Sequence, residues 1–517
     1  MGYPNLPGVT VNLNDLGLQI APPPAGPKIT FLGITSNTGI PLREAFTVTN
    51  VGQAVAALWV SGSSGEKYPG ELALAVEEAA NVGATNIEIV AIAHVTGDEM
   101  TSYWLPTGAG PGLRYSALAT AYEAIKDRPL NVVVPVNAWA DCPVNSGYFT
   151  EQLAQFCYSA TRDVDNACIG VIPLMPVMHW AMAYALSSSA NAIGLTGNAT
   201  LGTEVQAITG GGLETLYFGT PSQSLITQWE KETTRVGASY NLSPNSASNA
   251  WSGYLAGSED TTLGFVNYLD NDNDATAVKS AYWTFFQGED LAGNPVVDQR
   301  GNPADAGSRI SVVGAPLVTS LVSTAKLAAA FGGAASATQQ TTDGSASYGA
   351  KIVTLLPHSA PTNKRIPNVT SQRKLSGAQV NRLAGRRIVS FLDRATGFVV
   401  ASAMTGGHNV SQYIRTDYNR LTTVRIVDAT ISVIRNIGER FIGEPNTAAA
   451  RNALSGEIDK ALRGMKASRA ITGYRFSITA SPNQQVLGEA QVDLTLVPAF
   501  EMTKITVNVS LTKQLTG

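Results

Sequence analysis

Helix-like and strand-like hydrophobic patterns alternate in the first third of the chain. Residues 71–82 place Leu72 and Val76 on one helical face, Gly83 follows, and residues 87–92 form an apolar run. A glycine just beyond a helical pattern predicts a helix that ends there and leads into a buried strand. The pattern recurs: strand 29–34, helix 71–82 with strand 87–92, helix 115–126 with strand 131–136, and helix 149–161 with strand 167–172.

This alternation of helix and strand predicts an α/β region built on a mostly parallel sheet. Residues 187–350 are rich in Ser, Gly, Asn and Ala and carry a weaker pattern, whereas residues 336–347 and 357–367 are rich in turn-forming residues. We therefore expect an outer α/β region over residues 27–356, with room for two subdomains, and a boundary near residue 357.

The end of the chain has the clearest pattern of all. Apolar residues recur at helical spacing through residues 425–442 until Pro445 stops the helix, and Asn446 can cap a second helix at 447–467. Alternating positions then predict strands, with a turn at 481–483 between the first two and Pro498 after the second. The apolar positions are Tyr474, Phe476 and Ile478 in the first strand, Val492, Leu494 and Leu496 in the second, and Ile505, Val507, Val509 and Leu511 in the third.

We expect residues 357–500 to form an α+β domain, and residues 501–517 to form an extended C-terminal arm. A second arm is predicted over residues 1–26, where Val9, Val11 and Leu13 alternate with polar residues. Prolines isolate this segment from its neighbours in sequence, so it cannot pair with a strand next to it in the chain. The predicted fold class is therefore multidomain, α/β and α+β, with an extended arm at each end.

Charge and composition favour a protein that covers much of its surface. Charged residues make up 14% of the 517 residues, and the net charge is −4. Residues 1–350 hold 13 Lys and Arg against 29 Asp and Glu, a balance of −16, while residues 351–517 hold 22 against 10, a balance of +12. The low charge favours self-assembly, although a large monomer with a polar, uncharged surface is an alternative. The asymmetry favours an acidic partner for the basic end, the alternative being local pairing of the cations.

Cysteines and apolar runs limit the choice of compartment. Cys142, Cys157 and Cys168 form neither a CxxC pair nor a disulfide framework, which favours synthesis in a reducing interior. No apolar run follows Met1, so we expect no secretory signal. Residues 169–186 are uncharged, but Pro173, Pro176 and His179 interrupt them, and a buried strand followed by a helix at 177–186 explains them better than a membrane span.

Motifs that carry chemistry are weak. The acidic run 270–274 begins like a calcium loop, but Ala275 stands where the loop requires glycine. The four histidines are scattered, and neither a phosphate-binding loop nor a nucleophile elbow is present. We expect neither enzymatic activity nor a cofactor, with an α/β enzyme as the less favoured alternative.

The combined order of elements in the C-terminal region resembles that of contractile phage tail sheath proteins. The residues that carry the resemblance are Arg420-Leu421, Phe441-Ile442, Pro445-Asn446, Ile471-Thr472-Gly473-Tyr474, Asn483, Gly488, Pro498-Ala499-Phe500-Glu501 and the last alternating strand. The resemblance covers residues 413–515 firmly, and residues 6–93, which include Pro7-Gly8-Val9-Thr10-Val11, less closely.

The resemblance implies a structural protein of a virion tail, made in the host cytoplasm. Its implied partners are copies of itself in stacked hexameric rings, the tail tube, the baseplate and a tail terminator, with neither nucleic acid nor stable membrane insertion. It also implies strand exchange, in which the arms of two subunits add to the hairpin of a third subunit. The N-terminal arm carries Val9, Val11 and Leu13, and the C-terminal arm carries Ile505, Val507, Val509 and Leu511. A phage-derived extracellular injection system is the alternative.

A group of cations lies on or just after the second C-terminal helix. A helix dipole favours cations near the C-terminal end of a helix, where most of them lie. These residues could face an acidic tail tube or simply be solvated, and nucleic acid is a weaker candidate because no aromatic residues interleave with them. The group consists of Arg451, Lys460, Arg463, Lys466 and Arg469.

Overall fold

The computed structural model describes 14 segments of the chain. The predicted arms with their seven apolar residues, the helix at 177–186 and the acidic run at 270–274 lie outside them. The described residues are 27–61, 67–95, 112–136, 138, 140, 149–162, 166–173, 306–314, 318–321, 339–342, 344–371, 377–385, 387–407 and 416–501.

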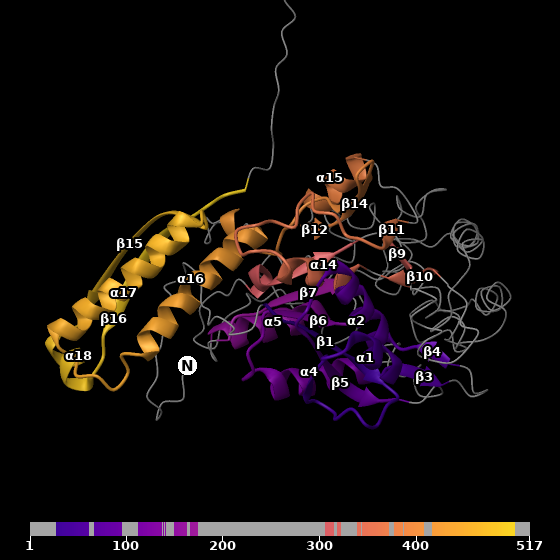
Figure 1. Ribbon diagram of the computed structural model, residues 1–517, viewed down its shortest axis with the longest axis horizontal. Coiled ribbons are helices and arrows are strands. Elements are labelled where there is room, and N and C mark those ends of the chain that lie inside the picture. Colours follow the sequence, from indigo (N-terminus) through magenta and orange to yellow (C-terminus); the bar gives the residue numbers. More distant parts are fainter. Residues whose placement is uncertain are drawn as a thin grey trace, which may run out of the picture.

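The larger part of the fold is organised around a seven-stranded sheet with the order β12-β8-β7-β6-β1-β5-β2 (Figure 1). All neighbouring strands are parallel except β2, which runs antiparallel to β5. The alternating pattern therefore predicts the sheet type correctly. Its strands are β1 (Ile29–Thr35), β2 (Ala45–Thr47), β5 (Ile87–His94), β6 (Val132–Pro135), β7 (Ile169–Pro173), β8 (Ile310–Val313) and β12 (Ile388–Val389).

The central strand β1 is buried along its whole length between β5 and β6. Because a parallel sheet is covered on both faces, its strands are apolar throughout rather than alternating. Gly170 on β7 shows how close the covering is, since a Cβ atom there would lie 2.6 Å from Cγ of Leu153 on the helix above it.

Helices cover both faces of this sheet. The predicted helix at 71–82 is α2, and it ends at Gly83 in the left-handed conformation (φ 103°). Leu72 of α2 and Tyr348 of α14 share a core with Phe31, while Leu153 of α5 faces the opposite side of the sheet at Gly170. The helices of this part are α1 (Val51–Ala57), α2 (Glu71–Val82), α4 (Gly112–Ile125), α5 (Phe149–Arg162), α14 (Ser345–Val353) and α15 (Gly377–Gly385).

One strand of the sheet bears on the predicted domain boundary, and smaller elements surround the sheet. Strand β12 completes one edge of the sheet although it lies beyond residue 356, so the α/β part draws on residues from both sides of the predicted boundary. The boundary itself stays a prediction. The remaining elements are β3 (Trp59–Ser61), β4 (Lys67–Pro69), β9 (Val318–Leu321), β10 (Gln339–Thr342), β11 (Val369–Ser371), β13 (Phe391–Arg394), β14 (Gly397–Val400) and the 3-10 helices η4 (Ala306–Arg309) and η5 (Thr416–Asn419).

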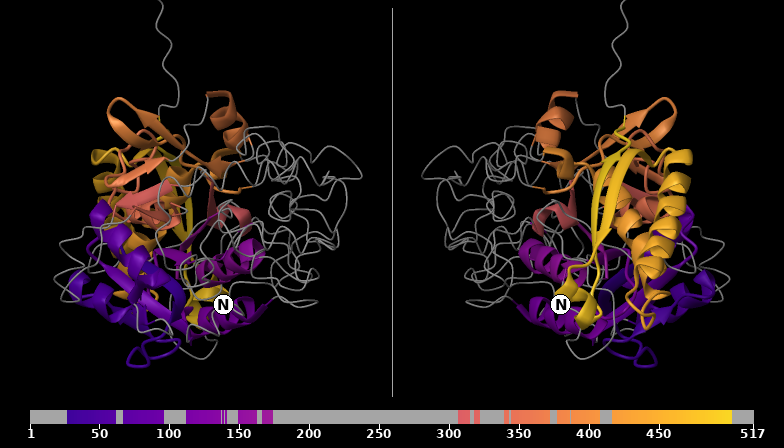
Figure 2. Two further views of the ribbon diagram at one scale, coloured as in Figure 1. Left: turned by 90° about the vertical axis from the view of Figure 1, so that its right-hand side faces the viewer. Right: turned by 90° about the vertical axis from the view of Figure 1, so that its left-hand side faces the viewer.

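A second, elongated unit extends to one side of the α/β part (Figures 1 and 2). Two long helices pack on a two-stranded hairpin, with α17 over β15 and α16 over β16. Helix α16 connects the two parts. The elements are α16 (Leu421–Glu439), α17 (Ala448–Ala467), β15 (Ile471–Thr479), α18 (Pro482–Leu487) and β16 (Gln491–Pro498).

Three details of this unit differ from the prediction. Helix α16 begins at Leu421 rather than at residue 425. The cap of α17 is Thr447, whose hydroxyl accepts from the amide of Ala450, and not Asn446. The predicted turn at 481–483 is instead the start of the short helix α18, because Ser481 and Gln484 form a capping box.

The apolar core divides along α16. Leu421 and Val424 in its first turn belong to the large core of the α/β part. Ile434 and Ile437 in its last turns belong to a separate core with Leu462 of α17. The C-terminal unit therefore has a core of its own, and α16 is the element that both cores share.

Candidate assembly interface

The β15–β16 hairpin has one apolar face and one polar face. Its residues alternate between half-buried and exposed along both strands, as expected for a sheet covered on one side only. The polar face turns away from the helices. It consists of Thr472, Arg475, Ser477 and Thr479 on β15 and of Gln491, Asp493 and Thr495 on β16, together with the exposed apolar Val497.

The six apolar residues predicted to form the acceptor hairpin come together on the covered face. Tyr474, Phe476 and Ile478 on β15 lie opposite Leu496, Leu494 and Val492 on β16, and all six pack against the small core. The rings of Tyr474 and Phe476 stack at 6.5 Å, and the Tyr474 hydroxyl donates to Asp459 of α17 at 2.8 Å. These side chains fix the hairpin to its own helices, so a partner strand would meet the backbone edges instead.

Neither backbone edge of the hairpin pairs with a further strand of the described residues. Strands β15 and β16 pair with each other over most of their length, and no third strand among the described residues joins them. An unpaired edge presents a row of amide and carbonyl groups that can accept another strand. Within the described residues, the hairpin thus has two unpaired edges, and the two helices cover one of its faces.

The tip of the hairpin carries exposed apolar residues. Val486 is 87% exposed and Leu487 is 70% exposed, and both lie on the short helix α18. Gly488 ends α18 in the left-handed conformation (φ 75°). Asn446 ties the tip to the turn between α16 and α17 by donating to the carbonyl of Glu489 at 2.7 Å.

The predicted cations divide into two sets. Lys460, Arg463, Lys466 and Arg469 are exposed in the C-terminal half of α17 or just beyond it, and Arg463 pairs with Asp459 at 2.6 Å. Arg451 lies one heptad before the buried Ile458 and therefore on the same helix face. It is half-buried, and its guanidinium donates to the side chain and the carbonyl of Asn446 at 2.7 and 3.2 Å.

Buried charges join α16 to the α/β part. The guanidinium of Arg309 donates to both carboxylate oxygens of Asp428, at 2.6 and 2.8 Å, and both side chains are buried. Burial raises the pKa of Asp428 to about 6, although the charges of Arg309 and Arg425 act in the opposite direction. Asp428 therefore remains mainly ionised at neutral pH, while the Asp428 charge also raises the pKa of Arg309 against the effect of burial.

A buried arginine of α16 binds the chain that follows α14. Arg425 donates to the carbonyl oxygens of Leu355, Leu356 and Ser359 at 2.6, 3.2 and 3.4 Å. Burial lowers its pKa to about 10. Because a helix ends with unsatisfied carbonyls and a negative dipole end, a cation placed just beyond α14 is favourable there.

Sequence reasoning missed this joint. Arg309 and Asp428 are 119 residues apart, and their pairing depends on the placement of η4 against α16. The one available signal is that Arg425 and Asp428 interrupt the apolar stripe of a predicted buried helix. A charged residue on a buried helix face is normally paired.

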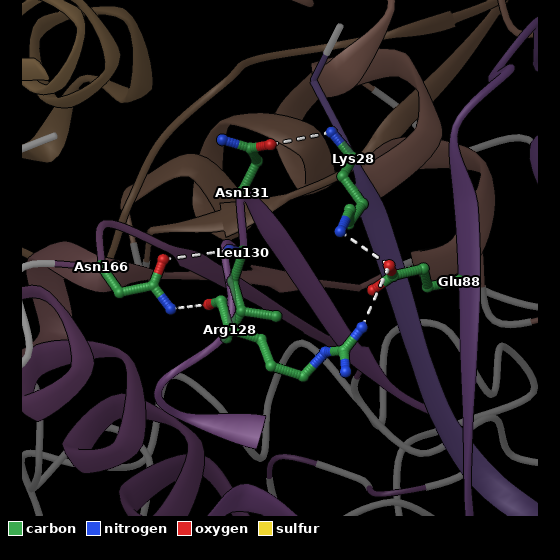
Figure 3. A network of polar contacts seen from close by, with 6 residues as sticks. All are labelled: Lys28, Glu88, Arg128, Leu130, Asn131 and Asn166. Carbon is green, nitrogen blue, oxygen red and sulfur yellow. Dashed lines mark hydrogen bonds and ion pairs between the residues drawn. The ribbon is translucent and has the colours of Figure 1, made fainter. Parts of the chain in front are cut away.

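The other end of the described chain is also fixed by polar contacts, which Figure 3 shows. The Lys28 amide donates to the Asn131 side chain at 2.9 Å, and its ammonium lies 2.6 Å from the carboxylate of the buried Glu88. Asn166 links the adjacent loops by accepting from the amide of Leu130 at 3.0 Å and donating to the carbonyl of Arg128. Residue 28, which follows the predicted N-terminal arm, is therefore held firmly at the start of β1.

The described residues contain neither a membrane-spanning helix nor a group of metal-binding side chains. Within those 14 segments, no helix is long and apolar enough to span a membrane. In the same residues, no three His, Cys, Asp or Glu side chains gather in a way that could hold a metal ion. Strand β7 occupies the first part of the uncharged stretch 169–186, as predicted.

Comparison with known proteins gives a family for the C-terminal region and a fold for the chain. Residues 415–512 match the family described as phage tail sheath C-terminal domain. No curated protein matches the chain at a significant level. The sheath complex of an extracellular contractile injection system, PVC, in the contracted state is 11% identical, with a TM-score of 0.50 and coverage of 99% of this chain and 98% of that chain.

Two crystal structures of sheath tail proteins are also similar. The protein from Desulfitobacterium hafniense is 9% identical, with a TM-score of 0.44 and coverage of 95% of this chain and 100% of its own. The protein from Listeria innocua is 10% identical, with a TM-score of 0.42 and coverage of 93% of this chain and 94% of its own. The match of residues 415–512 confirms what the order of C-terminal elements predicts: the chain resembles the contractile phage tail sheath proteins.

Proposed function

We propose that this protein is the sheath subunit of a contractile tail-like particle and that it polymerises through its C-terminal unit. The observation that carries the proposal is the β15–β16 hairpin, which is covered on one face and open at both edges among the described residues. The match of residues 415–512 to the phage tail sheath C-terminal domain supports the same conclusion. Stacked hexameric rings around an inner tube, with baseplate and terminator proteins at the ends, follow from that resemblance.

Strand exchange is the mode of assembly that fits the hairpin best. Residues 505–511 alternate over seven positions, which is two residues shorter than β15, whose nine residues run from Ile471 to Thr479. The seven-residue segment could therefore pair along most of one hairpin edge in another subunit. Burial of its four apolar side chains would contribute on the order of 6–12 kcal/mol as an upper bound, before the entropy of ordering is subtracted. The segment with Val9, Val11 and Leu13 is proposed for the other edge.

Removal of the C-terminal arm is the direct test. We expect a chain that lacks residues 503–517 to keep a folded protomer, because the small core is complete by residue 498. It should fail to form the tubes or rings that the full chain forms in negative-stain electron microscopy. The circular dichroism of the two proteins should agree.

A proline variant provides a matched control for that deletion. Val507→Pro removes one amide donor from the middle of the proposed strand, whereas a proline at Leu515 lies beyond it. Assembly should be lost in the first variant and kept in the second. Normal polymers from the deleted chain, or from Val507→Pro, would refute the assignment of the arm.

An extracellular injection system remains the alternative setting for the same subunit. The PVC sheath supports it only at the level of the fold, because the identity is 11%. Capsid genes beside the gene for this chain would favour a phage virion, and their absence an injection system. An α/β enzyme, the least favoured alternative, would be a small soluble oligomer that does not polymerise at high concentration.

A further inference from the structure

The last described residues are held against the first turn of α16. The amide of Ala499 donates to the carbonyl of Ala470 at 3.0 Å, which continues the hairpin pairing beyond β16. The guanidinium carbon of Arg420 then lies 5.2 Å from the centre of the Phe500 ring. A cation at this distance from an aromatic ring is attracted to it. Three successive residues at the exit of the C-terminal unit, Ala499, Phe500 and Glu501, are thus close to fixed groups.

Glu501 adds an electrostatic contact to this arrangement. Burial raises the pKa of its carboxyl group, and the charge of Arg420 acts in the opposite direction. Its Oε2 atom is buried and accepts no hydrogen bond from the described residues. Arg420 therefore lies over the Phe500 ring, and its charge partly compensates the burial of the Glu501 carboxylate.

Arg420 is itself fixed to the α/β part. It is the N-cap residue of α16, with extended backbone angles, and it forms an isolated β-bridge with Met404. The amide of Thr405 donates to the carbonyl of the preceding Asn419 at 2.9 Å. Leu421, the next residue, is fully buried in the large core. Any residue that Arg420 holds is consequently positioned relative to the sheet and not only to the hairpin.

We propose that Arg420 is a positioning residue for the C-terminal arm: it fixes the point and direction at which the chain leaves the C-terminal unit and couples them to the α/β part. This inference rests on the proposed function, since it concerns the arm that assembly would use. A fixed exit restricts the directions available to the following residues, so that a neighbouring hairpin is reached with a smaller loss of entropy. A movement of the α/β part would also be transmitted to the arm.

The competing explanation is that Arg420 only stabilises the C-terminal unit. Hydrogen exchange of the full-length, unassembled protein, followed by mass spectrometry, separates the two. We expect Arg420→Gln to increase exchange in peptides covering residues 499–501 on the order of fivefold, in line with the loss of one cation–aromatic contact. Exchange around the central pair Phe476 and Leu494 should stay unchanged. Arg420→Lys, which keeps the charge, should restore most of the protection.

Arg440→Gln is the matched control, because Arg440 is an exposed arginine at the other end of α16. It should leave exchange at residues 499–501 unchanged. The proposal is overturned if Arg420→Gln leaves these residues as protected as in the wild type, if it loosens the whole hairpin equally, or if Arg420→Lys fails to restore protection.

Assembly measured on the same variants keeps this inference separate from the proposed function. Arg420→Gln should slow polymer formation at protein concentrations where the wild type assembles, while deletion of residues 503–517 should abolish it. If the deleted chain still polymerises, the arm assignment fails, although the exchange result at Arg420 stands. If exchange at residues 499–501 does not respond to Arg420, the positioning role fails, although assembly through the arm stands.

Discussion

Single residues decide how the C-terminal unit is attached. Arg309, Arg425 and Asp428 are buried charges between the two parts, and each has a partner on the other side of the joint. Loss of one member of a buried ion pair is costly because it leaves a charge in a medium that solvates it poorly.

Asp428 should give the joint a measurable pH dependence. Its pKa is about 6 in the folded protein and 3.8 in an unfolded chain, so the folded state binds a proton more tightly. Its contribution to stability is therefore complete below about pH 4 and is lost as the pH rises through about 6. We expect the stability difference between wild type and Asp428→Asn to change by on the order of 1 kcal/mol in favour of wild type from pH 7 to pH 5.

Hydrogen exchange of α16, compared between the two proteins at each pH, measures this difference. Asp393→Asn is the control, because Asp393 is an exposed carboxylate on β13. It should show no such change. A difference for Asp428→Asn that is the same at pH 5 and pH 7 would contradict the prediction.

At the scale of elements, the periodicity of apolar residues predicts the helices and strands that local packing determines. Helix α2 appears with its predicted bounds, since Gly83 stops it in the left-handed conformation. The start of α16 was misplaced because its first turns are surrounded by the α/β core, which removes the contrast between apolar and polar faces. Strands β8 and β12 were not predicted, because their place in the sheet depends on pairing between distant segments.

In the candidate site, too, local patterns could be predicted from the sequence, whereas contacts between distant segments could not. The apolar residues of β15 and β16 could be predicted, since alternation alone assigns them to one face. The open edges, by contrast, depend on which other strands are absent from the neighbourhood, and the joint at Asp428 depends on contacts across 119 residues. Neither leaves a local pattern in the sequence.

The divided core predicts that the C-terminal unit can loosen by itself. Leu462 is fully buried in the small core, and truncation of such a leucine to alanine usually costs about 2–5 kcal/mol. We expect Leu462→Ala to increase hydrogen exchange in α17 and the β15–β16 hairpin while the seven-stranded sheet keeps its protection. Leu118→Ala on α4, also at a fully buried position, should have the opposite distribution. Equal loosening of both parts by either variant would show that they unfold as one unit.

At the scale of the whole molecule, exposed basic residues lie on the unit that projects from the α/β part. The chain is acidic before residue 351 and basic after it, and four of the exposed cations lie on or just beyond the C-terminal half of α17. The elongated unit that carries them extends away from the α/β part (Figure 1). A basic surface on a projecting unit suits long-range attraction to an acidic partner, which here would be the inner tube.

Charge reversal tests this attraction. Lys460→Glu combined with Lys466→Glu changes the local charge by four units at exposed positions, so the fold should be unaffected. We expect weaker cosedimentation with the inner tube at about 50 mM salt and a smaller difference between wild type and variant at about 300 mM, because screening shortens the range of the attraction. Arg394→Glu, at the exposed last residue of β13, is the control and should bind as the wild type does. Unchanged binding of the doubly reversed protein at both salt concentrations would mean that these lysines are solvated and that the tube is recognised elsewhere.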